Sequence, residues 1–327
     1  MAAPVQVARA LAEDLLAPAA ADVDATGVLP RGHLDALAAA GLYGLVGPAE
    51  AGGLDGDGAT LAAVVEELAA GDLATAFVWL QHHGVVGRLA ASGAHPELLA
   101  GLCAGRRRAG IALQAATRPD APPVTLRRDG GDLVLDGAVP WVTGWGLVDV
   151  LLVAARDGDD VAFVLADAVE GPTLAAVPQP LVAVQASATV ELHLRGHRVP
   201  AGRLLGATPL AEVRAGDAAG LRLNGSLALG LVRRCARLVG PSPLDADLAA
   251  AGARLDGAGP GELPEARAAA AALELRAAGA LVVATGSGAA RAGSVAERTA
   301  REAVFLLVFG SRPAIRASLL ARLGAAR

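Results

Sequence analysis

The spacing of apolar side chains changes twice along this chain, and the order of those changes constrains the fold more than any single motif does. From the start to about Leu102, apolar residues recur every three or four positions, which is typical of amphipathic helices. Helices are predicted over Val5–Leu16, Gly32–Ala40, Ala59–Ala70 and Ala74–Ala91. In the third of these helices, the carboxylates of Glu66 and Glu67 are expected to face outward.

A second pattern begins near Gly110, where apolar residues alternate with polar ones and Gly, Asp and Pro recur at short intervals. Alternation with a period of two is typical of half-buried strands. Strands are predicted over Val124–Arg127, Leu133–Leu135, Val150–Ala154, Ala162–Leu165 and Thr189–Leu194. Several short strands without helices between them indicate an antiparallel sheet or barrel and argue against a Rossmann sheet.

Helical spacing returns after Thr208. The strongest candidates are Leu223–Leu238, Pro264–Val283, Val295–Val308 and Ile315–Leu323. The predicted fold class is therefore a multidomain α+β protein with three parts. These are an N-terminal helical bundle (residues 1–110), a central antiparallel β-barrel-like domain (111–207) and a C-terminal helical bundle (208–327).

Composition argues against nucleic-acid binding. The formal net charge is −5, and only 2% of the residues are aromatic. A nucleic-acid site needs a basic stripe with aromatic stacking partners. The one tight basic run, Arg106 to Arg108, is interpreted as a solvated helix end or turn.

No metal site and no membrane insertion are expected either. The two cysteines, Cys103 and Cys235, lie far apart and form no CxxC pair. His82 and His83 belong to no metal-ligand motif, and we expect one imidazole in the core and one on the surface. We see no signal peptide and no uninterrupted apolar stretch long enough to span a bilayer, so a cytoplasmic location is expected.

Several local phrases, in this order, resemble the acyl-CoA dehydrogenase family over nearly the whole chain. Leu34–Asp57 and Val64–Gly84 are similar to helices of the family's front domain. Gly131–Ala155 resembles its strand–turn–strand with a Trp-x-Thr, and Glu191–Gly206 resembles the exit strand. The phrases LRLNGSLALGLV and AERTAREAVFLLVFG resemble the first and last long helices of the back domain.

The resemblance implies FAD-dependent α,β-desaturation of an acyl thioester, carried on CoA or on an acyl-carrier protein. In that reaction a carboxylate removes the α-hydrogen as a proton, and the β-hydrogen leaves as hydride to the flavin. The base needs a dry pocket, and the flavin needs hydrogen-bond donors and an apolar wall.

The same resemblance assigns five residues to flavin binding. Trp141 and Thr143 match the family's Trp-x-Thr, where the indole covers the flavin and the hydroxyl faces N5. Thr117 matches the Thr or Ser of a Thr-Glu-Pro turn, and Gln114 and Ala116 match neighbouring positions that line the ring. Without the resemblance, Trp141 would be interpreted as a core residue and Thr143 as an ordinary strand-end hydroxyl.

The sequence departs from the family pattern at several positions, and one of them is the position of the family's catalytic residue. Pro122 and Pro123 stand where the family has small residues with free backbone N–H groups. The family's catalytic Glu falls on Gly310, and an alternative base position on the first back-domain helix falls near Gly220 or Leu221. No catalytic residue is therefore assigned. A further family segment is missing between Leu238 and Leu244, so the back domain looks shorter by about one helical segment.

Three interpretations remain. The chain is a base-less subunit of a heteromeric dehydrogenase, a dehydrogenase whose base is Glu212 or Asp217, or a flavin-dependent monooxygenase or tailoring enzyme of the same fold. Each predicts FAD and an acyl-type ligand, and a homo- or hetero-oligomer with another acyl-CoA dehydrogenase-like chain. A non-catalytic scaffold with a decayed site is the alternative outside these three.

Overall fold

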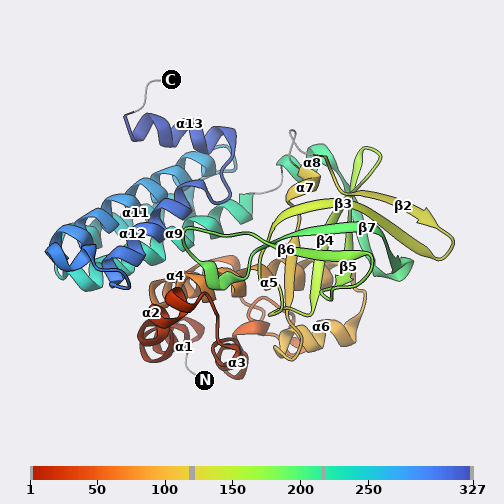
Figure 1. The fold of residues 1–327 in the computed structure, drawn as a ribbon, viewed down its shortest axis with the longest axis horizontal. Helices are drawn as coiled ribbons and strands as arrows, with labels where there is room; N and C mark the ends of the chain where they lie inside the picture. The colour runs from red at the N-terminus through yellow and green to blue at the C-terminus, as the bar shows by residue number, and fades with distance from the viewer. Residues whose placement is uncertain (1–2, 118–121, 216–217, 325–327) are drawn as a thin grey trace.

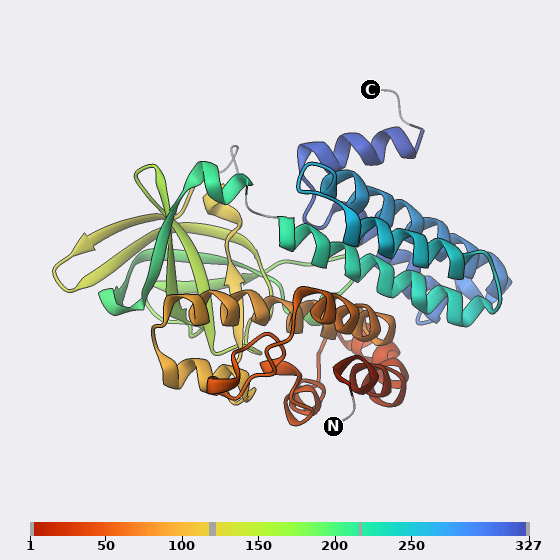
Figure 2. The same cartoon turned by 180° about the vertical axis from the view of Figure 1, so that it is seen from behind.

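The computed structural model describes residues 3–117, 122–215 and 218–324 of the chain. Three parts are visible in Figure 1: a sheet, a bundle of C-terminal helices beside it, and N-terminal helices that run beneath both. The view from behind shows α4 and α5 passing under the junction between the sheet and the C-terminal bundle (Figure 2).

The N-terminal part is helical, as predicted. Asp57 caps α4 and Asp72 caps α5, each accepting a hydrogen bond from the backbone N–H three residues on, and Gly27 and Gly93 end their helices in the left-handed conformation. The helices are α1 (Pro4–Leu11), the π-helical η1 (Ala12–Leu16), α2 (Ala17–Thr26), α3 (Arg31–Ala39), η2 (Leu42–Gly44), η3 (Ala49–Ala51), α4 (Gly58–Gly71), α5 (Leu73–Ser92) and α6 (Pro96–Cys103).

The central part is one sheet with the strand order β6-β7-β3-β2-β4-β5-β8, and β1 pairs with β4. The predicted antiparallel pairing holds for most neighbours, but β4 pairs in parallel with both β1 and β2, so the sheet is mixed. Its strands are β1 (Ala109–Ala112), β2 (Thr125–Asp129), β3 (Asp132–Val142), β4 (Val150–Asp157), β5 (Asp160–Asp167), β6 (Leu174–Pro178), β7 (Val190–Pro200) and β8 (Leu204–Pro209).

Short helices flank the sheet, and longer ones form the C-terminal part. Ser294 caps α12 by accepting a hydrogen bond from the N–H of Glu297. The short helices are α7 (Gln114–Thr117), η4 (Gln185–Ser187), η5 (Ala201–Arg203) and α8 (Leu210–Ala215). The C-terminal helices are α9 (Ala218–Val239), α10 (Leu244–Gly257), α11 (Leu263–Thr285), η6 (Gly286–Ala290), α12 (Val295–Val308) and α13 (Pro313–Arg322).

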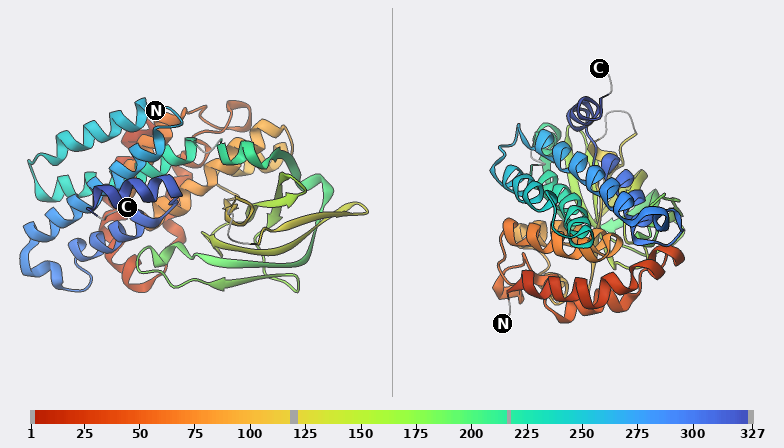
Figure 3. Two further views of the ribbon diagram at one scale, coloured as in Figure 1. Left: turned by 90° about the horizontal axis from the view of Figure 1, so that it is seen from above. Right: turned by 90° about the vertical axis from the view of Figure 1, so that its left-hand side faces the viewer.

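The two helical parts share one hydrophobic core. A single cluster joins buried side chains of α1 to α5 with those of α9 to α13, and the sheet has clusters of its own. Figure 3 shows the C-terminal helices lying directly over the N-terminal ones. Because Ala, Leu and Val make up most of this core, helix axes can approach closely; at Gly230 of α9 an added Cβ would lie 2.7 Å from the carbonyl oxygen of Glu66 on α4.

The prediction that Glu66 and Glu67 face outward is wrong. Both carboxylates are buried between α4 and α9. Glu66 pairs with Arg233 at 2.8 Å, and Glu67 pairs with Arg237 at 2.7 Å and with Arg9 at 2.9 Å. Arginines that approach from other helices make burial of these two carboxylates tolerable, and they cannot be recognised from the local pattern.

The predictions for two other polar runs also need correction. His82 and His83 are both buried, so neither imidazole is on the surface. The Nδ1 atom of His82 accepts a hydrogen bond from the N–H of Ala109 at 3.1 Å. Arg108 is buried as well: its guanidinium bonds to Asp35 and lies over the ring of Tyr43, so this arginine is not part of a solvated turn.

Within the described residues, one helical stretch has the length and apolar composition of a membrane span, Leu263–Ala290. Glu274 and Arg276 interrupt it, and 44% of its most apolar window is buried. Core helices of soluble proteins pass the same test, so this is weak evidence for a span. In the structure α11 packs against α9, α10, α12 and α13.

Candidate functional site

Trp141 lies near the end of β3 in a conformation that a core tryptophan would not adopt. Its side chain is 48% exposed and its φ is +64°, in the left-handed region that non-glycine residues rarely occupy. The backbone N–H of Trp141 donates to Oε1 of Gln179 at 2.8 Å, outside the regular β3–β7 ladder. The interpretation of Trp141 as a core residue is therefore wrong.

The hydroxyl of Thr143 is the first of three buried hydroxyl groups that lie within hydrogen-bond distance of one another in series. Its Oγ1 lies 3.2 Å from Oγ1 of Thr189, which in turn lies 2.8 Å from Oγ of Ser187. All three side chains are buried. Because each hydroxyl has one proton, the direction of this chain decides whether Thr143 donates its proton to Thr189 or presents it elsewhere.

Backbone strain concentrates around Trp141. Among the described residues, five non-glycine residues have positive φ, and three of them are Trp141, Val184 (+52°) and Ala188 (+48°). The segment that contains the latter two is bonded to the loop after β3: the N–H of Gly144 donates to the carbonyl of Ser187 at 2.8 Å. Strained residues cluster at functional sites more often than elsewhere, which makes this junction the leading candidate.

The other predicted flavin residues lie on α7, which directly follows β1 and contacts β3 and β4. Gln114 is exposed, whereas the Ala116 side chain is buried among the side chains under the sheet. Thr117 belongs to α7, but its side chain lies outside the described residues. Gly110 of β1, four residues before Gln114, lies beside the carbonyl of Thr143.

A side chain at the position that the family resemblance gives to a catalytic carboxylate would be strained and would have to displace the amide of Asn224. Gly310, in the turn between α12 and α13, has a φ of +60°. A Cβ added there would lie 2.7 Å from Nδ2 of Asn224, which reaches across from α9. Asn224 is the only asparagine in the chain.

Aromatic rings surround that turn. Phe309 stacks on Phe305 at a centroid distance of 5.6 Å, and Phe77 of α5 meets Phe309 edge-on at 4.8 Å. Three of the four phenylalanines of the chain meet here. The turn that contains Gly310 is therefore apolar, and it lies where α5, α9 and α12 come together.

Among the described residues, the remaining candidate positions offer no buried carboxylate. Glu212 is exposed on α8, which contacts the sheet and α7. Gly220 and Leu221 of α9 carry no carboxylate, and Asp217 lies outside the described residues. Arg222 of α9 bonds to Asp256 at 2.7 Å and to Ser226 at 2.6 Å.

Comparison with known proteins shows which family the chain is similar to. The family described as "Acyl-CoA dehydrogenase, N-terminal domain" matches residues 3–104. A probable acyl-CoA dehydrogenase (FadE25) of Mycobacterium leprae is 29% identical over 210 residues, which is 61% of this chain and 54% of that protein. The N-terminal part of the chain matches the acyl-CoA dehydrogenase family. Its alignment spans about half the length of the curated relatives that it matches.

The fold of this chain agrees with that of solved acyl-CoA dehydrogenase-like structures. Butyryl-CoA dehydrogenase from Megasphaera elsdenii superposes with a TM-score of 0.83 at 18% identity, covering 98% of this chain and 96% of that one. A nitrososynthase from Micromonospora carbonacea superposes with a TM-score of 0.80 at 21% identity, covering 98% and 95%. The predicted order of helical, sheet and helical parts is confirmed.

Sequence reasoning missed the residues that support the candidate site. Gln179 holds the Trp141 backbone, and Ser187 and Thr189 complete the hydroxyl chain. The cluster of small hydroxyl residues in QASAT was a signal, but only the pairing of β3 with β7 places it beside Thr143. The role of Asn224 was missed because it depends on how α9 meets the α12–α13 turn.

Proposed function

We propose that this chain is a FAD-linked protein that binds an acyl thioester and acts as a base-less subunit beside another acyl-CoA dehydrogenase-like chain. The single observation behind this proposal is the contact between Gly310 and Asn224. Glycine has no titratable group, and Asn224 is a neutral amide. A partner chain would therefore supply the carboxylate that removes the α-proton.

The residues present fit a flavin at Trp141. A half-exposed indole held in a strained backbone offers the flat apolar wall that a planar ring needs, and Thr143 offers a hydroxyl. Gln114, Ala116 and Thr117 of α7 would contact the same ligand. When bound, FAD would accept the hydride of a desaturation. The role of this chain is to orient the ring and keep water out.

A second candidate is an oxygenating or tailoring enzyme on this fold, for which no α-proton base is needed. Two observations favour it: the closed position at Gly310 and the similarity to the solved nitrososynthase. The substrate of such an enzyme need not be a thioester.

The experiment that tests the proposal is an absorbance spectrum of the chain purified alone and after co-expression with a neighbouring acyl-CoA dehydrogenase-like chain. We expect flavin bands and a stable complex in the second case, with anaerobic bleaching by acyl-CoA. Flavin in the chain alone, with oxygen consumed and no bleaching by acyl-CoA, would favour the second candidate. Absence of flavin in both preparations would favour the interpretation of the chain as a non-catalytic scaffold.

A further inference from the structure

Asn224 is a polar residue in an otherwise apolar stripe of α9. Three residues that lie three or four positions away, and therefore on the same face of the helix, are Leu221, Leu227 and Ala228. All three are buried in the core that the two helical parts share. A side-chain amide on the core-facing side of a helix costs free energy unless its groups are hydrogen-bonded, so packing alone does not explain Asn224.

No group in the described part of the chain satisfies this amide. Among the described residues, no donor or acceptor forms a hydrogen bond with the side chain of Asn224. The three phenylalanine rings that surround the Gly310 turn are hydrocarbon and supply no partner either. A side-chain amide has two N–H donors and a carbonyl acceptor. These groups are therefore available to a ligand.

The space beside the amide is open on the side of Gly310. A Cβ added to Gly310 would meet Nδ2 of Asn224 at 2.7 Å and its Cγ at 3.6 Å, and no other described atom outside residues 309–311 lies within 4 Å of that point. Asn224 and Gly310 are both half-buried rather than enclosed. A ligand atom that enters the space of the missing side chain therefore meets the amide first.

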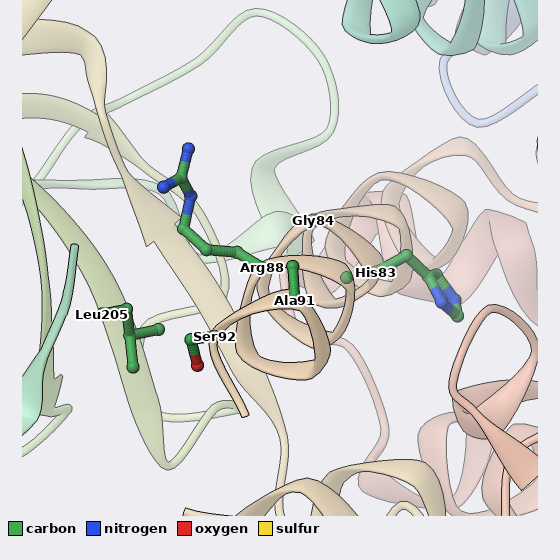
Figure 4. Close-up of a pocket in the computed structure, with 7 residues that line it drawn as sticks. His83, Gly84, Arg88, Ala91, Ser92 and Leu205 are labelled. Atoms are coloured by element: carbon green, nitrogen blue, oxygen red, sulfur yellow. The ribbon is translucent and has the colours of Figure 1, made fainter. Parts of the chain in front are cut away.

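This place is distinct from the open groove, about 500 Å³ in volume, that runs along the C-terminal half of α5. Figure 4 shows Arg88, Ser92 and Leu205 on one side of α5, whereas the ring of His83 points to the other side. No lining residue of the groove belongs to α9 or to the turn between α12 and α13. A ligand held in the groove alone would not contact Asn224.

The chemistry of the amide indicates which ligand group it would meet. The family resemblance gives Gly310 to a base that acts on the α-carbon, so the ligand group beside Asn224 is the α-carbon or one of its substituents. A purely hydrocarbon group there would cover the amide and leave its donors and acceptor without partners, which costs free energy. A hydroxyl on the α-carbon removes that cost, because a hydroxyl donates and accepts as the amide does.

We propose that Asn224 determines specificity by hydrogen-bonding an oxygen on the α-carbon of the ligand, so that the preferred ligand is a 2-hydroxyacyl thioester. The thioester in this statement rests on the proposed function. The loss of a titratable group at Gly310 is compatible with this role, because holding a hydroxyl requires a donor and an acceptor but no base.

The test compares 2-hydroxybutanoyl-CoA, 3-hydroxybutanoyl-CoA and butanoyl-CoA by calorimetric titration of the whole chain together with any partner chain that co-purifies. We expect the 2-hydroxy compound to bind about tenfold more tightly than butanoyl-CoA, which corresponds to about 1.4 kcal/mol. The 3-hydroxy compound should bind no more tightly than butanoyl-CoA. Asn224→Leu keeps the branching of the side chain without polar atoms and should remove the preference.

Two further variants separate recognition of the hydroxyl from packing. Gln6→Leu makes the same change from an amide to leucine at an exposed residue of α1, and all three affinities should stay unchanged. Asn224→Ser keeps a group that donates and accepts, and it should retain part of the preference that Asn224→Leu removes. A purely structural role of Asn224 would change the three affinities together and leave their ratios as they are.

Equal affinities of the natural chain for 2-hydroxybutanoyl-CoA and butanoyl-CoA would overturn this inference, and so would a preference that survives Asn224→Leu. Both outcomes require a bound thioester, so they leave the proposed function standing. An equal loss of affinity for all three thioesters in Asn224→Leu would assign the amide to the thioester carbonyl and would likewise overturn the preference for a hydroxyl. If none of the three thioesters binds, the proposed function fails and this inference fails with it.

Discussion

The Nδ2 atom of Asn224 lies 2.7 Å from the point where a side chain at Gly310 would begin. Gly310 also has a φ of +60°, which side chains rarely adopt. Two independent restrictions therefore act on the same residue. One comes from the backbone of the α12–α13 turn, and the other comes from a side chain of α9.

The first prediction separates these two restrictions. Gly310→Ala should destabilise the protein by about 2 kcal/mol, because strain at a positive φ and contact with Asn224 add together. Gly41→Ala, at a positive φ with open space, measures the backbone part alone. Asn224→Ala in the Gly310→Ala background should recover the difference in urea unfolding. If Gly310→Ala and Gly41→Ala cost the same, Asn224 does not close the position.

The second prediction concerns a catalytic carboxylate. Gly310→Glu alone should be poorly folded and inactive, whereas Gly310→Glu with Asn224→Ala should fold better, because the amide no longer blocks the new side chain. In the flavin-loaded protein, the double variant should bleach with acyl-CoA under anaerobic conditions without a partner chain. No bleaching in a well-folded, flavin-loaded double variant would show that position 310 is not aligned with the substrate.

The third prediction tests whether the side chain of Trp141 is needed for ligand binding or for stability. Trp141→Gly relieves the positive φ and removes a half-exposed ring, so the free energy of unfolding should change by less than about 1 kcal/mol. Flavin affinity should fall at the same time. Trp79→Leu, at a fully buried tryptophan, should instead lower stability by several kcal/mol, roughly 3. A large loss of stability in Trp141→Gly would make this ring structural.

The fourth prediction uses the two buried histidines. Burial lowers the pKa of His82 to about 3 and lowers the pKa of His83 well below its ordinary value. The unfolded chain therefore binds more protons than the folded one once the pH falls below about 6.5. Each histidine should then remove stability by roughly 1.4 kcal/mol per pH unit down to its folded pKa. Urea unfolding of His83→Leu should show a shallower acid slope than the natural chain, and an unchanged slope would contradict the assignment.

The fifth prediction has the opposite sign. Glu274 is fully buried on α11, and neither of its carboxylate oxygens has a hydrogen-bond partner in the described chain, so burial raises its pKa well above the ordinary value. The folded state then holds a proton that the unfolded state has lost, and stability falls as the pH rises toward the folded pKa. Glu274→Gln should remove this fall. A loss of about 3 kcal/mol or more at neutral pH would indicate an ionised pair with Arg267 instead.

Local pattern was sufficient for most of the elements. Predicted helix Val295–Val308 coincides with α12, and Pro264–Val283 lies within α11, because amphipathic spacing over a long stretch depends only on consecutive residues. Helices α2 and α6 were missed, and so were strands β1, β6 and β8. The three strands are short, and β6 and β8 end in proline, so a period of two has little length in which to appear.

The candidate site was only partly predictable. Trp141 and Thr143 were identified through the family resemblance, but the exposure and strain of Trp141 follow from Gln179, 38 residues away. The same holds for polar residues in helices. From the local sequence, Glu67 is predicted to lie on the surface. In the structure it pairs with Arg9 of α1 and Arg237 of α9.

The order of residues thus determined which segments become helix or strand, because that choice depends on neighbours within a few positions. The docking of distant segments decided which charges are buried, which ring is exposed and which position is closed. Those outcomes depend on which surfaces meet, as Asn224 of α9 meets Gly310. Burial and close approach are properties of pairs of elements, and no single stretch of sequence contains both members of such a pair.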